Sequence, residues 1–547
     1  MKRNFLFFIS LFFMTFICNL TTVEAKIGQG ISYYRAGFPQ VAKPLLLNDY
    51  LNESSAKDET CFNLGNIYFE ENKLDSAAYY FNKGLVANPL NSLNSIGLNM
   101  LKIKSDPATA ELEFQKIVKQ KENKKNIDVY IAIANAYLSN NVIDKASSYQ
   151  EKAKEIKTKY APLYVLLGDI ELAKKNIGTA CSNYELGIYY DDKCKEAYIK
   201  YARAYKNVNT PLAIEKLNVL KTKEPSFLLA DKELADIYYS INKFDKAAEL
   251  YEVYLKSGNS NVMDLTKYAF TLFLNGQFEK SLEVTNIGLA KAPTNPALNR
   301  LSMYNNVDLK HTDAAIKAAD LFFNKSEKPE FTYLDYRYYG QALRDNKQID
   351  LAIPQFEKAL QIDSTKTELW KDISDMYSDK SDFVKSVSAY TNYLNSLPAD
   401  KKDADAMMPL AKYYYSLGND AKVDATLKKG YLLKADSIFS IIATDEPTGY
   451  RGNFWRARTN SALDPETTQG LAKPFYEKTV TLVEAKADPR YNSVLSECYS
   501  YLGFYYLLQK DNAQSMIYWT KILAIDPTNV TAKKASEGIT KAMKGKK

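Results

Sequence analysis

The chain has 547 residues, of which 46% are hydrophobic, so it can bury more apolar surface than one globular core usually holds. Its 72 basic and 65 acidic side chains leave a net charge of +7, a small excess that does not argue for nucleic-acid binding. Gly (21) and Pro (18) are scarce, whereas Tyr (42) and Phe (25) are abundant, which disfavours disorder. We therefore expect a mostly helical chain built as several domains or as a repeat array.

Residues 1–25 have the pattern of a secretory leader peptide. Two basic residues precede an apolar stretch from Phe5 to Cys18, and a polar region ends at Ala25, after which cleavage is expected. The apolar stretch is shorter than the roughly 20 residues of a membrane-spanning helix, so an uncleaved anchor is the less favoured alternative. We predict export across the inner membrane, to the periplasm or the periplasmic face of the outer membrane. Tethering to a membrane stays open, although no later segment has the pattern of a membrane span.

A spacing of small residues recurs along the rest of the chain. A small residue is followed 12 positions later by another and, in many copies, by an aromatic residue 4 positions beyond that. Clear copies start at Gly65, Gly168, Ala235, Gly340, Ser374 and Gly503. From Ala134 to Ala269, successive first members lie 34, 34, 33 and 34 residues apart, which is the period of a helix-turn-helix repeat. Two antiparallel helices approach closely only where they present Gly, Ala or Ser, so these residues mark helix contacts.

The clearest copy identifies the kind of repeat. Gly65 and Tyr68 share its first helix, Ala77 and Phe81 share its second, and Pro89 ends it. This pattern resembles the tetratricopeptide repeat (TPR), and the resemblance covers nearly all of the chain after the leader. It implies an all-α fold, a right-handed α-solenoid (superhelix) of about 12–13 TPR-like helix-turn-helix units with a C-terminal capping helix.

The regularity of the spacing varies along the chain. Ala411, Ala457 and Gly503 are separated by 46 residues each, which predicts insertions. We divide the chain into the leader, a short partial repeat at 26–57, a regular array at 58–400, an irregular array at 401–528 with insertions at 444–453 and 463–470, and a capping helix with a basic tail at 529–547. For the last segment, a polybasic binding tail is the less favoured alternative.

Motifs for catalysis and for metal binding are missing from the sequence. The only histidine, His311, is predicted to lie in an exposed turn, and no glycine-rich phosphate loop, HExxH or CxxC occurs. Cys181 and Cys194 would lie roughly 20 Å apart along a helix, and Cys61 and Cys498 belong to opposite ends of the array, so four free thiols are expected, with Cys61 buried. We predict no enzyme, no metal centre and no cofactor.

The TPR resemblance implies that the first helix of each unit lines a concave ligand-binding face. Helical spacing then places on this face the residues three before, one after and four after the small residue, which we call ligand-facing positions. The aromatic and arginine residues of the insertion at 444–453 are of the kind that is enriched at binding hot spots, although Trp455 and Arg458 just beyond it are expected to pack. The candidate partner-binding residues are Phe62, Asn66, Phe69, Lys232, Asp236, Tyr239, Arg337, Gln341, Arg344, Lys371, Asp375, Tyr450 and Arg451.

These residues predict a non-catalytic protein-binding scaffold or adaptor in the cell envelope, whose partners are envelope or outer-membrane proteins. The segments Asp75–Leu85 and Phe454–Pro465 also resemble secreted TPR proteins of the Bacteroidota, which agrees with this location. The alternative is a carbohydrate or peptidoglycan recognition protein that uses aromatic residues in its groove. A minor alternative is an enzyme at the C-terminal insertions, which a cleft with two convergent carboxylates would favour.

Overall fold

The structure is a computed structural model that describes residues 28–52, 57–256, 258 and 261–544. All regular elements of these residues are helices, which confirms the predicted all-α fold. None of the helices in these ranges is long and apolar enough to span a membrane. The predicted leader at 1–25 lies outside the described residues.

A short helical hairpin comes first, made of a helix at 28–35 and of α2 (Pro39–Leu51). We call residues 28–51 the N-terminal hairpin. Thirteen helix pairs follow it in the described part of the chain, and each pair is one repeat. The first helices of these pairs are α3 (Lys57–Glu70), α5 (Ser92–Met100), α7 (Ile127–Ser139), α9 (Ala161–Ala173), α11 (Lys195–Tyr205), α13 (Leu229–Ser240), α15 (Val262–Leu274), α17 (Pro296–Asp308), α19 (Tyr333–Asp345), α21 (Leu369–Asp379), α23 (Ala404–Asn419), α25 (Arg451–Leu463) and α27 (Asn492–Leu508).

Each first helix is followed in the chain by a second helix. The second helices are α4 (Leu74–Ala87), α6 (Pro107–Lys119), α8 (Ile143–Ile156), α10 (Ile177–Tyr190), α12 (Thr210–Lys223), α14 (Phe244–Leu255), α16 (Phe278–Lys291), α18 (Thr312–Lys325), α20 (Ile349–Ile362), α22 (Phe383–Ser396), α24 (Ala425–Asp445), α26 (Lys473–Glu484) and α28 (Asn512–Ile525). The predicted terminal helix is present as α29 (Val530–Lys544), and it buries Ala532 and Ile539.

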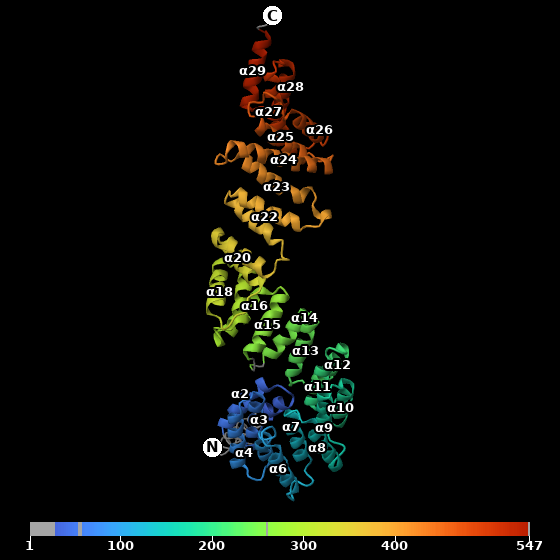
Figure 1. Ribbon diagram of the computed structural model, residues 1–547. Coiled ribbons are helices and arrows are strands. Elements are labelled where there is room, and N and C mark those ends of the chain that lie inside the picture. Colours follow the sequence, from blue (N-terminus) through green and yellow to red (C-terminus); the bar gives the residue numbers. More distant parts are fainter. Residues whose placement is uncertain (1–27, 53–56, 257, 259–260, 545–547) are drawn as a thin grey trace, which may run out of the picture. The chain divides into compact units, whose positions relative to one another are not determined.

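The chain forms two compact blocks of packed helices (Figure 1). The N-terminal block runs to Leu309 and also includes Asn324–Glu327. The C-terminal block comprises Lys310–Phe323 and the chain from Lys328 onward. Within each block, helix pairs that follow one another in the sequence pack together.

The small residues have a direct steric role. A Cβ atom built on Gly65 or on Gly97 would lie 2.3 Å from Cε1 of Phe81, so the Phe81 ring is held between two glycines. Likewise, a Cβ atom on Gly168 would lie 2.2 Å from the ring of Tyr184. The small residue of the first helix therefore makes room for the aromatic residue 16 positions later, which explains the spacing that the sequence repeats.

Much of the extra length in the irregular array at 401–528 is helical. α24 has 21 residues, so helix continues to Asp445 and only residues 446–450 connect it to α25. The second connection, after α25, is ordered by Asp464, whose carboxylate accepts hydrogen bonds from the backbone N–H groups of Gln469 (3.0 Å) and Gly470 (2.8 Å). The second connection therefore has its backbone N–H groups satisfied by a side chain of its own segment.

Candidate functional site

The N-terminal hairpin covers ligand-facing positions of α11 and α13. Its buried apolar side chains share one hydrophobic cluster with those of the two helices and their connection: Ile31, Tyr33, Phe38, Val41 and Leu46 from the hairpin, and Tyr198, Ile199, Phe227, Leu229, Leu234 and Ile237 from the array. The ring of Phe227 lies 5.7 Å from that of Tyr33 and 6.4 Å from that of Phe38, both edge-on. Burial of large apolar side chains contributes about 1.5–3 kcal/mol each, so this contact is strong.

Arg203, at the ligand-facing position after Ala202, fastens the hairpin. Its Nη1 donates a hydrogen bond to the carbonyl oxygen of Gly37 (2.9 Å), and its Nε donates to Glu233 (3.0 Å). Its guanidinium also lies 4.6 Å from the centre of the Phe38 ring. Gly37 has φ +83°, a backbone conformation that favours glycine. A Cβ atom at this position would also lie 2.6 Å from Nη1 of Arg203, so a larger residue would clash with the guanidinium.

Polar contacts surround the hairpin where it meets α3. The Tyr34 hydroxyl donates to Glu70 (2.7 Å), and Arg35 donates to Glu59 (2.7 Å). Burial raises the pKa of both Tyr34 and Glu70. The hairpin thus joins the first repeat to the fifth and sixth repeats and takes the place that a ligand would occupy there.

The candidate residues Lys232 and Asp236 of α13 form ion pairs and hydrogen bonds with other residues of the N-terminal block. Asp236 accepts a hydrogen bond from the Tyr251 hydroxyl and pairs with Lys267 (2.8 Å). Lys232 lies 3.2 Å from Asp236 and 3.5 Å from the buried Asp264. Asp169 repeats the arrangement two repeats earlier, with Tyr184 (2.8 Å) and Lys200 (2.5 Å) as its partners. The charges at these positions therefore neutralise one another.

The other candidates of the N-terminal block are half-buried. Phe62 and Phe69 pack against the hydrophobic cluster of the first repeats, and the Phe62 ring lies 6.1 Å from that of Phe81. Asn66 is partly exposed between them on the helix. The Tyr239 ring packs edge-on against Phe244, at 5.7 Å.

In the C-terminal block, α19 and α21 place five candidates on consecutive first helices. Arg337 and Lys371 are exposed, and Gln341 is half-buried. Arg344 pairs with Asp372 of the next first helix (2.9 Å). Asp375 is exposed and accepts a hydrogen bond from the hydroxyl of Tyr413 (2.9 Å) on α23.

Tyr450 and Arg451 hold the start of α25 in place. The Tyr450 ring lies 5.4 Å from that of Tyr491 and 6.1 Å from that of Phe454. Arg451 pairs with Asp405 (2.8 Å) and with Glu446 (3.1 Å). Both side chains have intramolecular partners, while each keeps part of its surface exposed.

A row of cations and aromatic rings follows on α23 and α25. Lys412 is exposed, and its Nζ lies 5.0 Å from the centre of the Trp455 ring. Tyr415 meets the same ring edge-on at 5.3 Å. Arg458 lies 4.9 Å from it and makes a two-pronged ion pair with Glu497 of α27 (2.8 and 2.5 Å). Among the described residues, neither Lys371 nor Lys412 has a carboxylate partner, so both positive charges are available to a ligand.

The row ends in an apolar surface on α27. Phe504, Leu507 and Leu508 are 44%, 37% and 42% exposed, although Phe504 and Leu507 occupy the ligand-facing positions after Gly503. Sequence reasoning did not nominate these residues or Lys412 and Tyr415. The register already applied to Gly65 and Ala235 finds Lys412, Tyr415, Phe504 and Leu507 when it is extended to Ala411 and Gly503, whereas Leu508 lies next to a ligand-facing position and not at one.

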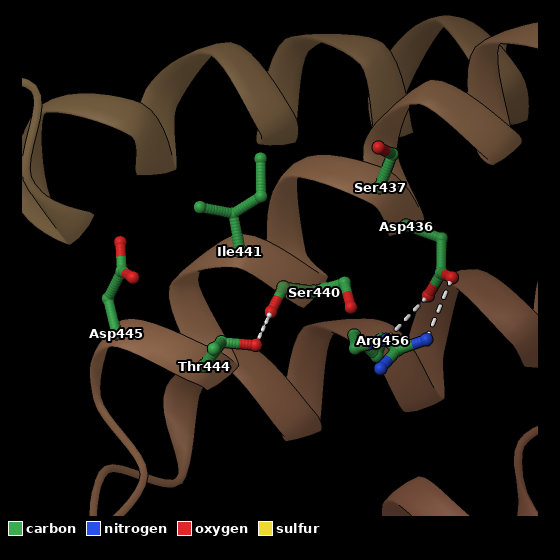
Figure 2. Close-up of a pocket in the computed structure, with 7 residues that line it drawn as sticks. All are labelled: Asp436, Ser437, Ser440, Ile441, Thr444, Asp445 and Arg456. Carbon is green, nitrogen blue, oxygen red and sulfur yellow. Dashed lines mark hydrogen bonds and ion pairs between the residues drawn. The ribbon is translucent and has the colours of Figure 1, made fainter.

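A pocket of 430 Å³ lies beside α24 and α25, lined by residues of both helices (Figure 2). Arg456 donates from Nε to one oxygen of Asp436 (3.1 Å) and from Nη2 to the other (3.2 Å), so this carboxylate is neutralised. Asp445, the second carboxylate, is nine positions away on the same helix, or about 13 Å along its axis. Paired-carboxylate hydrolysis needs about 5–9.5 Å, so the two do not form such a pair.

Two of the buried thiols are poorly suited to nucleophilic chemistry. Cys61 is buried, as predicted, and burial raises the pKa of both Cys61 and Cys181 to about 11. At neutral pH these thiols are therefore protonated and weak nucleophiles. His311 is exposed, which confirms its predicted turn location.

Comparison with known proteins agrees with the repeat geometry. The tetratricopeptide-repeat family model matches residues 58–89, 127–160 and 339–366. No curated protein matches the chain.

Solved structures similar to the chain include the C-terminal part of a TPR repeat-containing protein from Cytophaga hutchinsonii. It is 30% identical, the match covers 49% of this chain and 98% of that one, and the TM-score is 0.40. A tetratricopeptide repeat protein from Parabacteroides merdae is 16% identical over 46% of this chain and 98% of its own, with a TM-score of 0.31. Yeast Tom70 is 12% identical over 72% and 96% of the two chains, with a TM-score of 0.28.

Proposed function

Because this chain belongs to the tetratricopeptide-repeat proteins, we propose that it is a protein-binding scaffold of the cell envelope whose partner binds the C-terminal block. The observation that carries the proposal is the row on α23, α25 and α27, together with the exposed Lys371 on α21. In the N-terminal block the hairpin and internal ion pairs occupy the equivalent positions of α11 and α13. On α27 no other segment among the described residues covers Phe504, Leu507 and Leu508 to the same degree, since all three stay exposed.

The chemistry of the row defines the partner. Lys371 and Lys412 offer two ammonium groups that have no carboxylate partner among the described residues. Tyr415 and Trp455 offer partly exposed rings, and Phe504 begins the apolar surface. The proposed ligand is therefore a protein segment in which acidic residues are followed by large apolar side chains. Such aromatic and apolar anchors supply most of the affinity at protein interfaces.

The proposed location is the periplasm or the periplasmic face of the outer membrane. It rests on the leader pattern of residues 1–25 and on the resemblance to secreted TPR proteins of the Bacteroidota. N-terminal sequencing of the protein isolated from fractionated cells tests it. A mature chain that starts at Lys26 in the envelope fraction is expected, and an intact leader on protein in the cytosolic fraction would contradict the proposal.

The binding surface is tested by affinity capture from envelope extracts. The immobilised full chain is compared with the double variant Phe504→Asp/Leu508→Asp and with Leu90→Asp. Leu90 is a suitable control because it is an exposed apolar residue, 83% accessible, in the N-terminal block. We expect one stoichiometric protein to bind the wild type and Leu90→Asp, and at least about tenfold weaker binding to the double variant.

Peptide and glycan arrays probed with the same three proteins separate the proposal from carbohydrate recognition. The largely exposed aromatic side chains in the described part of the chain are Tyr79, Tyr189, Phe331 and Phe504, which do not form a row along the first helices. Binding to acidic–apolar peptides is expected. Binding to glycans alone would overturn the scaffold proposal, as would equal capture by all three proteins.

A further inference from the structure

Positive charge is concentrated in two short segments of the N-terminal block. Residues 116–125 contain five lysines and one glutamate, and residues 152–159 contain four lysines and one glutamate. Together these segments carry a net charge of +7, which equals the net charge of the whole chain. The rest of the protein is therefore neutral as a sum, and we call the two segments the lysine edge.

The two segments belong to one surface. Each begins near the C-terminus of a second helix, α6 or α8, and continues into the connection to the next repeat. The Tyr160 hydroxyl, just after the second segment, donates to Asp128 at the start of α7 (2.7 Å). The Tyr130 hydroxyl of α7 donates to the carbonyl oxygen of Lys124 in the first segment (3.4 Å).

The lysine side chains are exposed and largely unpaired. All nine are exposed, and only Lys116 has an ion pair within the described residues, with Glu113 (2.7 Å). Lys152 and Lys157 lie over the rings of Tyr149 (4.5 Å) and Tyr160 (4.6 Å), contacts that leave their charge uncompensated by a carboxylate. The surface thus presents a dense, uncancelled positive field.

Helix stability does not account for this density. Cations in the last helical turn are favoured by the helix dipole, but that effect fades beyond the turn, and Lys121, Lys124, Lys125, Lys157 and Lys159 lie past the helix ends. Three equivalent connections lack lysine altogether: residues 88–91 and 292–295 have no charged side chain, and residues 526–529 have one aspartate. The repeat fold therefore does not require these lysines.

The residue types of the lysine edge indicate which kind of partner it binds. No arginine occurs between Arg35 and Arg203, so the edge lacks the planar forks that recognise single phosphates or bases in pairs of hydrogen bonds. Lysine ammonium groups on flexible stems suit a broad surface of negative charge instead. Tyr130 and Tyr160, both partly exposed, add the amphipathic rings that are favoured at a lipid–water boundary. We propose that the lysine edge docks the N-terminal block on a bilayer rich in acidic phospholipid.

Sedimentation with vesicles tests this proposal on the full chain. The vesicles are phosphatidylcholine with or without about one quarter phosphatidylglycerol, in about 0.1 M salt. The edge variant is Lys121→Glu/Lys124→Glu/Lys125→Glu/Lys159→Glu. The control variant, Lys429→Glu/Lys533→Glu/Lys534→Glu/Lys541→Glu, changes the net charge equally and alters four lysines that are also exposed.

We expect the wild type and the control variant to bind only the vesicles that contain phosphatidylglycerol. Because each lysine near an anionic surface strengthens binding by roughly fivefold, the edge variant should bind at least about 100-fold more weakly. Equal losses in both variants would assign binding to bulk charge and overturn the proposal. It would also be overturned if the wild type failed to bind the anionic vesicles, or if it bound DNA through this edge but not the vesicles.

Discussion

The two blocks use the same helical register for opposite purposes. In the N-terminal block, the position after the small residue holds Arg203 against the hairpin and Asp236 against Tyr251 and Lys267. In the C-terminal block, the same position holds Lys412 and Phe504, both exposed. On these four helices a ligand-facing position is open only where no other part of the chain covers it, and this contrast is why the partner site is proposed on α23 and α27 of the C-terminal block.

The largest expected effect is that of Phe38→Ala, which should detach the N-terminal hairpin from α11 and α13. Phe38 is buried between Arg203 and Phe227, and truncation of a buried phenylalanine costs about 3–5 kcal/mol. Hydrogen exchange followed by mass spectrometry should show lost protection in α11 and α13 but not in α25 or α27. Unchanged exchange in α11 and α13 would show that the hairpin does not hold them.

Lys232→Met and Lys371→Met test the same register position in the two blocks. Lys232 neutralises the buried Asp264, so its loss should lower the free energy of unfolding by about 3 kcal/mol. Lys371 is exposed and should change it by less than about 0.5 kcal/mol. Urea denaturation of each variant measures the difference, and equal effects would remove the distinction between covered and open positions.

Gly168→Ala tests the steric basis that both blocks share. Its Cβ atom would lie 2.2 Å from the Tyr184 ring, so about 1–3 kcal/mol of destabilisation is expected. Gly178 on the neighbouring helix has open space around its Cα, and Gly178→Ala should not destabilise, since alanine favours helix. Thermal melts followed by circular dichroism would distinguish the two substitutions, and similar melting temperatures would count against the register.

Glu111→Gln probes the internal neutralisation of the N-terminal block through pH. Burial alone would raise the pKa of Glu111, but hydrogen bonds from Tyr137, Gln115 and Lys145 outweigh it and lower the pKa to about 2. A lowered pKa stabilises the fold above the ordinary value near 4.5, and this contribution fades as the pH falls toward 2. At pH 7 the variant should lose about 2 kcal/mol.

The pH dependence of this loss is the decisive measurement. Urea titrations between pH 7 and pH 3 should show the wild type and Glu111→Gln converging as the pH falls. Glu113→Gln is the control. Glu113 pairs with the exposed Lys116, a surface ion pair, so the substitution should have a small effect at every pH. A Glu111→Gln deficit that did not shrink with pH would show that packing, and not charge, stabilises this site.

The sequence pattern predicted the repeat well, because the contacts that define the repeat join residues close together in the chain. The small residue and the aromatic residue 16 positions later lie on two helices joined by a short turn, so their contact can be read from spacing alone, as Gly65 and Phe81 illustrate. The last helix and the exposed turn of His311 were predicted for the same reason. The register also extends to Phe504, once the irregular stretch is passed.

The sequence by itself thus determined an all-α array of helix pairs and the set of positions that can face a ligand. Only the tertiary structure decided which of these positions are open. The hydrogen bond from Arg203 to Gly37 joins residues 166 positions apart, and no periodic pattern encodes such a contact. Coverage by the hairpin follows from apolar side chains that are distant in sequence and lose their water together, a property of the folded block and not of any single repeat.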